Sequence, residues 1–224
     1  MKLATQARKK EMRHTMRFPT FIELRPSTVA IACVSIMLWL SSGCTPLPVS
    51  PIVPVPEEPL EEQQEISRTA FLEAYEVFQH PRCKNCHPSG DSPLQFDDSV
   101  PHAMSVRRGE EGKGIIGMQC SACHQQDNWP GLNTPPGAPN WHLPPPDMLM
   151  VFEGKTPGEL ARQLKDPQQN GGHTLAEILH HVSADPLVLW GWDPGEGRSI
   201  PPLSHAEFVT LMETWIENGA VEPQ

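Results

Sequence analysis

The sequence predicts a mostly α-helical protein with extensive coil. Four segments carry apolar residues at helical spacing, and no stretch of useful length alternates between apolar and polar residues as a strand would. The chain of 224 residues also contains 26 prolines and 16 glycines, which predict long irregular segments between the helices. By its size, the part from 66 to 224 is expected to form one domain.

The first 43 residues are predicted to be an export signal. They contain seven Lys/Arg and two Asp/Glu, followed by an uncharged apolar run from 27 to 40. This run falls short of the roughly 20 apolar residues that a transmembrane helix needs. It ends in Leu40-Ser41-Ser42-Gly43-Cys44, which resembles the cleavage box of bacterial lipoproteins. That resemblance implies lipidation of Cys44 and anchoring to a membrane, with simple signal cleavage or an uncleaved anchor as alternatives.

Residues 44–65, which begin with the lipidated cysteine, are predicted to form a tether. Six prolines lie between 45 and 59, and five glutamates lie between 57 and 65. Proline favours an extended, semi-rigid chain, and clustered like charges extend it further. A tether of this kind would hold the folded domain away from a membrane surface. The alternative is a disordered stretch whose length has no role.

Four helices are predicted in the folded domain. The first is expected at about 66–79, with Ser67 as a possible cap. It places six apolar or aromatic side chains on one face: Ile66, Ala70, Phe71, Ala74, Tyr75 and Phe78. The others cover about 157–165, 175–183 and 205–218. Each of these begins with a capping box, in which Ser or Thr is followed three residues later by Glu: Thr156 and Glu159, Thr174 and Glu177, Ser204 and Glu207.

Two copies of a Cys-x-x-Cys-His motif are the most informative feature of the chain. They are Cys83-Lys84-Asn85-Cys86-His87 and Cys120-Ser121-Ala122-Cys123-His124. This spacing is typical of a c-type haem attachment site, in which both thiols bind the porphyrin and the histidine is an axial iron ligand. The alternatives are one zinc ion held by four thiolates, or a disulfide framework. Because histidine follows both pairs, the sequence predicts two covalently attached haem c groups.

The cysteine count agrees with this interpretation. There are six cysteines: Cys33 lies in the apolar export segment, Cys44 ends it, and the other four form the two motifs. No cysteine is left over for a structural disulfide or for a nucleophilic thiol. The predicted domain 66–224 is therefore a compact dihaem cytochrome c domain, whose cofactors complete a small core.

The sixth ligand of each iron decides between an electron carrier and a catalyst, because an open iron can bind substrate. We predict His102 and His142 as these ligands, since each lies in a proline-bounded loop that could direct an imidazole to an iron. For both, the alternative is a hydrogen-bonding histidine in a loop. Met104 and Met148 are the thioether candidates. His80 lies too close to Cys83 to reach the distal face of its own haem easily, but it could serve the other haem or line an electron path. The remaining histidines (His173, His180, His181 and His205) are expected to be exposed or to make structural hydrogen bonds.

The charge of the chain limits its partners. The net charge is −10, and removal of residues 1–43 leaves ten basic and 25 acidic residues, a net charge of −15. This surface argues against a nucleic-acid partner, whose phosphates require Lys and Arg. It suits a protein partner with a basic docking surface, although the charge also serves solubility alone.

Several segments together resemble a family of small proteobacterial dihaem cytochrome c-like proteins, of the type labelled isoquinoline 1-oxidoreductase subunit. They are His80–Pro88, Gly137–Pro145, Arg162–Pro167 and Trp190–Gly195. The resemblance implies a periplasmic electron acceptor that serves a molybdenum hydroxylase or a similar dehydrogenase. The region from His102 to His124 also distantly resembles the dihaem subunit of periplasmic nitrate reductase, and that family's bis-histidine ligation favours His102.

These observations predict a periplasmic, lipid-anchored dihaem cytochrome. It would transfer single electrons between a dehydrogenase or hydroxylase partner and the respiratory chain. The alternative is a small dihaem enzyme, a peroxidase or a sulfur-compound oxidoreductase, with one open haem iron. Nothing in the sequence marks a distal catalytic group, which favours the carrier.

Overall fold

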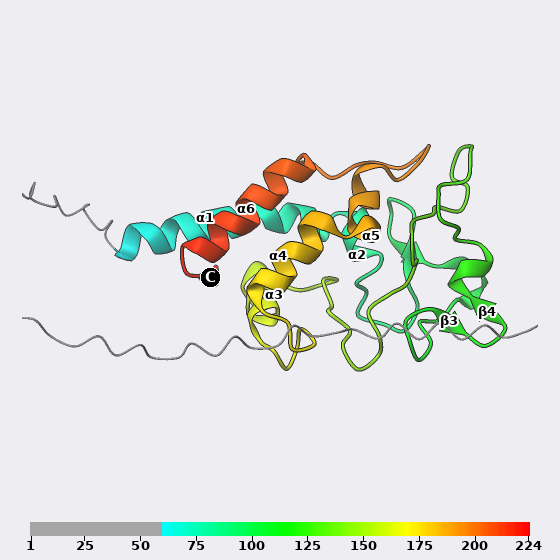
Figure 1. Ribbon diagram of the computed structural model, residues 1–224, viewed down its shortest axis with the longest axis horizontal. Coiled ribbons are helices and arrows are strands. Elements are labelled where there is room, and N and C mark those ends of the chain that lie inside the picture. Colours follow the sequence, from blue (N-terminus) through cyan, green and yellow to red (C-terminus); the bar gives the residue numbers. More distant parts are fainter. Residues whose placement is uncertain (1–59) are drawn as a thin grey trace, which may run out of the picture. The chain divides into compact units, whose positions relative to one another are not determined.

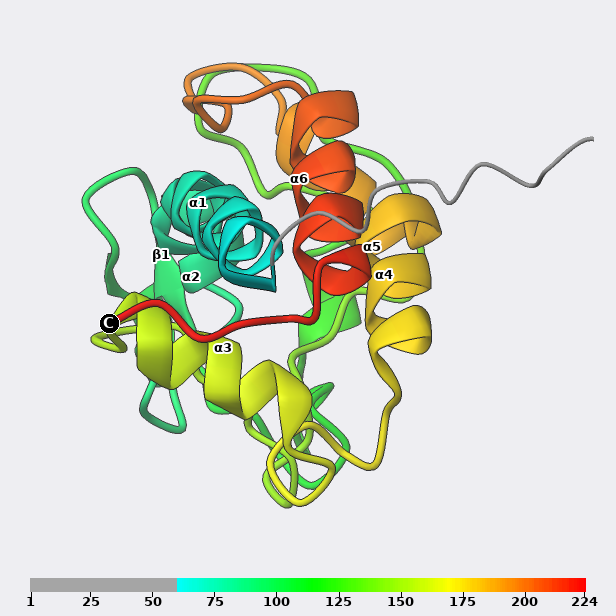
Figure 2. The same ribbon diagram turned by 90° about the vertical axis from the view of Figure 1, so that its left-hand side faces the viewer.

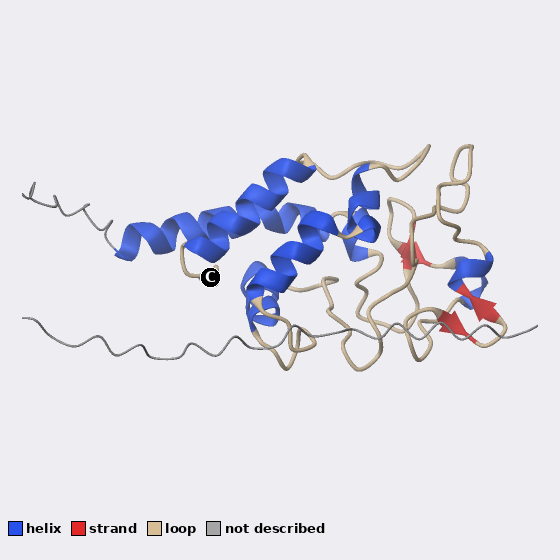
Figure 3. Ribbon diagram, viewed as in Figure 1, coloured by secondary structure: helices blue, strands red, loops and turns tan. Residues whose placement is uncertain are grey.

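The computed structural model describes residues 60–224. The predicted signal 1–43, the lipidation site Cys44 and the tether up to residue 59 lie outside the described residues. The described part is mostly helical with long coil segments, as the sequence predicts (Figures 1 and 3). Its helices are α1 (Leu60–Gln79), α2 (Pro81–Lys84), α3 (Pro157–Lys165), α4 (Leu175–Ala184), α5 (Pro186–Leu189) and α6 (His205–Glu217).

Helices α1 and α6 lie side by side and form the centre of the hydrophobic core (Figures 1 and 2). The ring centroids of Phe71 and Trp215 are 4.7 Å apart, and those of Phe78 and Phe208 are 5.2 Å apart. All four rings are almost wholly buried. Aromatic pairs at this separation gain energy beyond the apolar area they bury.

Ser67 is not the cap of α1 but a buried hydrogen-bonding group in its interior. Its hydroxyl donates to the Trp215 carbonyl at 2.9 Å and accepts from the Val221 N–H at 3.0 Å. The sequence suggested a cap because serine often begins a helix. Here α1 begins at Leu60, and Glu61 and Glu62 occupy its first turn, where acidic side chains interact favourably with the helix dipole. The helix therefore includes the last residues of the predicted tether.

The three predicted capping boxes all form. Thr156, Thr174 and Ser204 each accept a hydrogen bond from the N–H of the glutamate three residues later, and that glutamate reaches back to the cap. Helix α3 has the predicted bounds, α4 ends one residue later and α6 ends one residue earlier. After α6 the chain returns to α3, where the Glu222 carboxylate pairs with Arg162 at 3.1 Å and with Lys165 at 3.2 Å.

The part between α2 and α3 is coil with two small antiparallel sheets (Figure 3). Strand β1 (Leu94–Gln95) pairs with β2 (Val100–Pro101), and β3 (Gly114–Ile115) pairs with β4 (Met118–Gln119). The fully buried Arg108 donates to the carbonyls of Gly90 at 2.9 Å and Pro144 at 2.5 Å. These bonds hold together coil segments that have few apolar contacts of their own.

No helix within residues 60–224 is both long enough and apolar enough to cross a membrane.

We predict that Ser67→Ala lowers the free energy of unfolding by about 1–3 kcal/mol, because the buried Trp215 carbonyl loses its donor and the partly buried Val221 N–H loses its acceptor. Urea unfolding followed by circular dichroism measures this change. Thr69→Ala is the matched control: it removes a hydroxyl from an exposed position of the same helix and should change stability by less than about 0.5 kcal/mol. Equal effects of both variants would show that the Ser67 hydrogen bonds do not stabilise the α1–α6 contact.

Candidate functional site

The structure places the two Cys-x-x-Cys-His motifs in two different cavities. The first cavity, of about 320 Å³, is lined by Cys83, Cys86 and His87 together with side chains of α4. The second, of about 400 Å³, is lined by Cys120, Cys123 and His124 together with coil residues. Both volumes fall within the roughly 300–1,000 Å³ typical of cofactor sites.

Each motif folds into a tight turn whose two thiols and imidazole line the same cavity, and Cys86 of the first motif also reaches the second cavity. In the first motif the N–H of Cys86 donates to the Cys83 carbonyl at 3.2 Å, and the N–H of His87 donates to the Lys84 carbonyl. In the second motif the N–H groups of Cys123 and His124 both donate to the Cys120 carbonyl, at 3.1 and 2.9 Å. The turns differ in detail, since the first overlaps α2 and the second is a short 3-10 helix.

His87 is held rigidly and in the neutral form. Its Nδ1 lies 2.7 Å from the Met150 carbonyl, and its ring stacks on Phe152 with centroids 3.9 Å apart. Burial lowers the pKa of His87 to about 3. Because a carbonyl only accepts hydrogen bonds, Nδ1 carries the proton and Nε2 keeps a free lone pair. A backbone carbonyl on the second ring nitrogen is the usual partner of a metal-binding histidine.

His124 has the same arrangement. Its Nδ1 lies 2.7 Å from the Pro136 carbonyl, and its ring stacks on Trp141 with centroids 4.4 Å apart and planes 4° from parallel. Burial lowers the pKa of His124 as well. The Trp141 ring therefore packs against the imidazole.

The four motif cysteines are free thiols. Burial raises the pKa of Cys83 to about 12 and that of Cys86 to about 11, and it also raises the pKa of Cys120. The reactive thiol of a Cys-x-x-Cys redox centre has a lowered pKa instead. These pKa values therefore disfavour a thiol–disulfide exchange centre at the first motif.

His102 and His124 both line the second cavity. The two ring centroids are 6.1 Å apart and the planes meet at 66°. The Nδ1 of His102 lies 2.9 Å from the Ala103 carbonyl, so its Nε2 is also free. The structure therefore brings the predicted ligand His102 close to the histidine of the second motif.

The first cavity contains His142 and a second candidate that the sequence did not favour. The Nδ1 of His142 lies 2.6 Å from the Asn140 carbonyl. His181 also lines this cavity, and its Nδ1 lies 3.2 Å from the Asp185 carboxylate. The sequence signal that could have identified His181 is its helical spacing. Ile178, His181 and Val182 of α4, and Asp185 directly after it, all line the cavity.

The other candidates divide between the cavities and structural roles. Met148 lines the first cavity and Met104 the second. His80 accepts from the Arg82 N–H at 3.3 Å and contacts the Ser199 hydroxyl at 3.1 Å, while the Nε2 of His205 lies 2.9 Å from the Val182 carbonyl. His80 and His205 are thus engaged in hydrogen bonds.

The two cavities fit the predicted cofactor. Each combines a mostly apolar wall, two thiols and an imidazole with a free Nε2, which is the donor set of a c-type haem. Within residues 60–224, no three His, Cys, Asp or Glu side chains converge on a point where they could hold an ion by themselves.

Comparisons with protein-family models, with curated proteins and with solved structures found no match to this chain. Its function is therefore inferred from its own residues and cavities.

We predict that Gly137→Ala destabilises the second cavity. A Cβ at this position would lie 2.1 Å from the Asp127 carbonyl oxygen, so the neighbouring Pro136 carbonyl would have to shift relative to His124. Differential scanning calorimetry should show a loss of about 1–3 kcal/mol, typical of overpacking. The control is Gly90→Ala, since a Cβ at Gly90 meets nothing within 4 Å. Unchanged stability in Gly137→Ala would mean that the loop adjusts freely.

Proposed function

We propose that this chain is an electron-transfer protein with two covalently attached haem c groups, one in each cavity. The main support is that each Cys-x-x-Cys-His motif lines a cavity of its own. The histidine of each motif, His87 or His124, also has a free Nε2. A bound haem would supply an iron that accepts and returns one electron at a time.

The thiols of Cys83, Cys86, Cys120 and Cys123 would form the covalent attachment. Each S–H adds across one vinyl double bond, so that one C–S and one C–H bond form and no oxidant is consumed. His87 and His124 would be the proximal ligands, with Nδ1 bound to a carbonyl in each case. That bond fixes the ring orientation and increases the basicity of Nε2.

The distal ligands support a carrier rather than an enzyme. His102 lies near His124 in the second cavity and would be the second axial ligand of a haem held there. In the first cavity, His142 and His181 both offer an imidazole, and Met148 offers a thioether. Two strong axial ligands leave no coordination position for a substrate, so each site would serve electron transfer alone.

The location and partner follow from the N-terminal segment and the charge. Lipidation at Cys44 would anchor the chain to a bacterial membrane on the periplasmic side. The acidic surface would then attract a redox partner with a basic docking surface, such as a dehydrogenase or a molybdenum hydroxylase-type enzyme.

The first test counts haem groups per chain by the pyridine haemochrome assay, after expression with a haem-attachment system. We expect two for the natural sequence and for the control Cys33→Ala, whose cysteine lies outside both motifs. The double variants Cys83→Ala/Cys86→Ala and Cys120→Ala/Cys123→Ala should each retain one. A natural chain without haem, with zinc bound instead, would overturn the proposal.

The second test separates a carrier from an enzyme by carbon monoxide binding to the reduced protein. We expect no binding to the natural protein or to His180→Ala, which removes an exposed histidine of α4. His102→Ala should bind one carbon monoxide, because it opens the second site. Between His142→Ala and His181→Ala, the variant that gains carbon monoxide binding identifies the sixth ligand of the first site. Binding by the natural protein without denaturation would instead favour the enzyme with one open iron.

A further inference from the structure

The two cavities share a wall, and a buried arginine lies in it. Arg82 and Cys86 line both cavities. Arg82 belongs to α2, directly before the first motif, and its side chain is 3% exposed. A guanidinium stays charged in a protein, so its burial needs anionic partners.

The visible partners of Arg82 leave most of its donors free. One Nη donates to the Asp97 carboxylate at 2.5 Å, and the guanidinium lies over the Trp190 ring, 5.8 Å from its centroid. Its Nε is buried and has no hydrogen-bond partner within residues 60–224. Asp97 is itself 46% exposed and also accepts from the Ser199 N–H at 3.0 Å. The guanidinium of Arg82 is therefore buried with a hydrogen-bond donor that no described residue satisfies, beside a carboxylate that is half exposed and shared with Ser199.

Arg82 is in contact with the surroundings of both motifs. On one side it precedes Cys83 in the chain. On the other, Trp190 packs edge-on against Trp141 with centroids 4.9 Å apart, and Trp141 stacks on His124.

Neither Arg198 nor Arg108, two other buried or half-buried arginines, lines both cavities. Arg198 lines the second cavity alone and donates to the carbonyls of Thr134 and Pro194. Arg108 lines neither cavity and donates to the carbonyls of Gly90 and Pro144.

We propose that Arg82 is a positioning residue shared by the two cofactor sites, where its free donors bind haem propionate and its charge raises the midpoint potentials of both irons. The inference depends on the proposed function. An arginine suits this ligand because its planar donors match a carboxylate in two parallel hydrogen bonds.

The sign of the effect follows from electrostatics. Reduction adds one negative charge to each iron, so a nearby cation favours the reduced form and raises the potential. Loss of the Arg82 charge should therefore lower both potentials. Loss of the Asp97 charge leaves Arg82 less neutralised and should raise both. Shifts of opposite sign in the Arg82 and Asp97 variants, each seen at both haem sites, distinguish an electrostatic role from a merely structural one.

The experiment is spectroelectrochemical titration of the full-length, haem-loaded protein, with haem counted first. Arg82→Gln is expected to lower both midpoint potentials, and Arg82→Lys is expected to lower them less. Asp97→Asn is expected to raise both, because it removes the charge but keeps an oxygen that accepts from the Ser199 N–H. Arg198→Gln is expected to shift the second site alone. Arg107→Gln is the control, because this side chain is 65% exposed, and it should shift neither. The double cysteine variants, which each keep one motif and therefore one haem, show which measured potential belongs to which site.

Each outcome bears on the proposal. Shifts in a single site, or shifts of the same sign in Arg82→Gln and Asp97→Asn, would overturn it while two haems per chain uphold the proposed function. If Arg82→Gln fails to fold or to bind haem, Asp97→Asn decides: a rise at both sites supports the proposal, and any other result overturns it. A natural chain without two haems overturns the proposed function and this inference together.

Discussion

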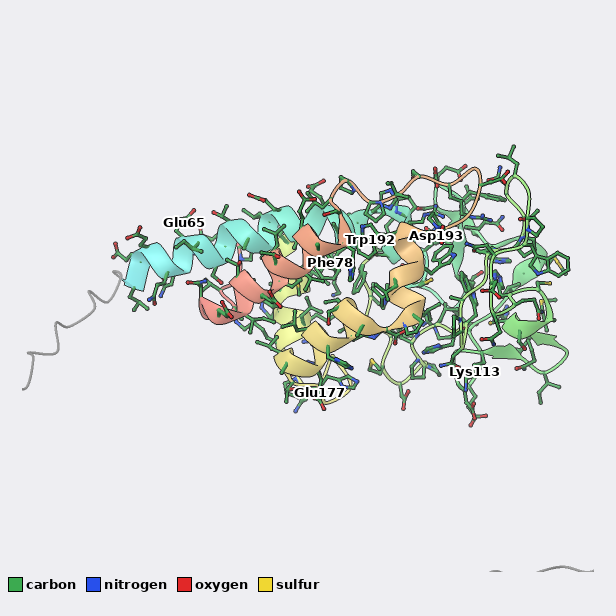
Figure 4. All side chains as sticks on the ribbon, turned by 45° about the horizontal axis from the view of Figure 1, so that its top comes forward. Glu65, Phe78, Lys113, Glu177, Trp192 and Asp193 are labelled. Carbon is green, nitrogen blue, oxygen red and sulfur yellow. The ribbon has the colours of Figure 1, made fainter. Side chains whose placement is uncertain are left out.

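The packing of α1 against α6 is the contact on which the rest of the described domain depends. It buries Phe71, Phe78 and Trp215, and through Ser67 it also holds the backbone of the C-terminal segment. Figure 4 shows Phe78 and Trp192 in the same region, near the end of α1 from which the chain continues into α2. The helical core thereby fixes the direction in which the first motif leaves α1, and it supplies one wall of the first cavity.

The coil part follows a different principle, because it contains few buried apolar residues. Its segments are joined by polar side chains that each bridge several backbone groups. Arg108 joins Gly90 to Pro144, and Asn128 accepts from the Gly137 N–H and the Trp190 indole while it donates to the Asp193 carbonyl. A cofactor in the second cavity would add the apolar contacts that this part lacks, as metals and disulfides do in small folds.

The two proposed haem sites are similar on the proximal side and different on the distal side. His87 and His124 each combine a carbonyl on Nδ1 with a stacked aromatic ring, Phe152 or Trp141. Besides its motif histidine, the second cavity is lined by His102, whereas the first is lined by His142, His173 and, from α4, His181. Two sites with different surroundings and a common charged wall would differ in potential, and such a difference gives an electron a preferred direction between them.

The sequence by itself determined the helices with capping boxes and located the two Cys-x-x-Cys-His motifs, because these depend on residues only three or four positions apart. It missed the start of α1, the buried role of Ser67 and the orientation of His181, since each depends on what the other side of a helix contacts. Only the tertiary structure decided that the motifs line two cavities, that His102 lies near His124 and that Arg82 lines both cavities. These relations join segments far apart in the chain, and no local pattern encodes them.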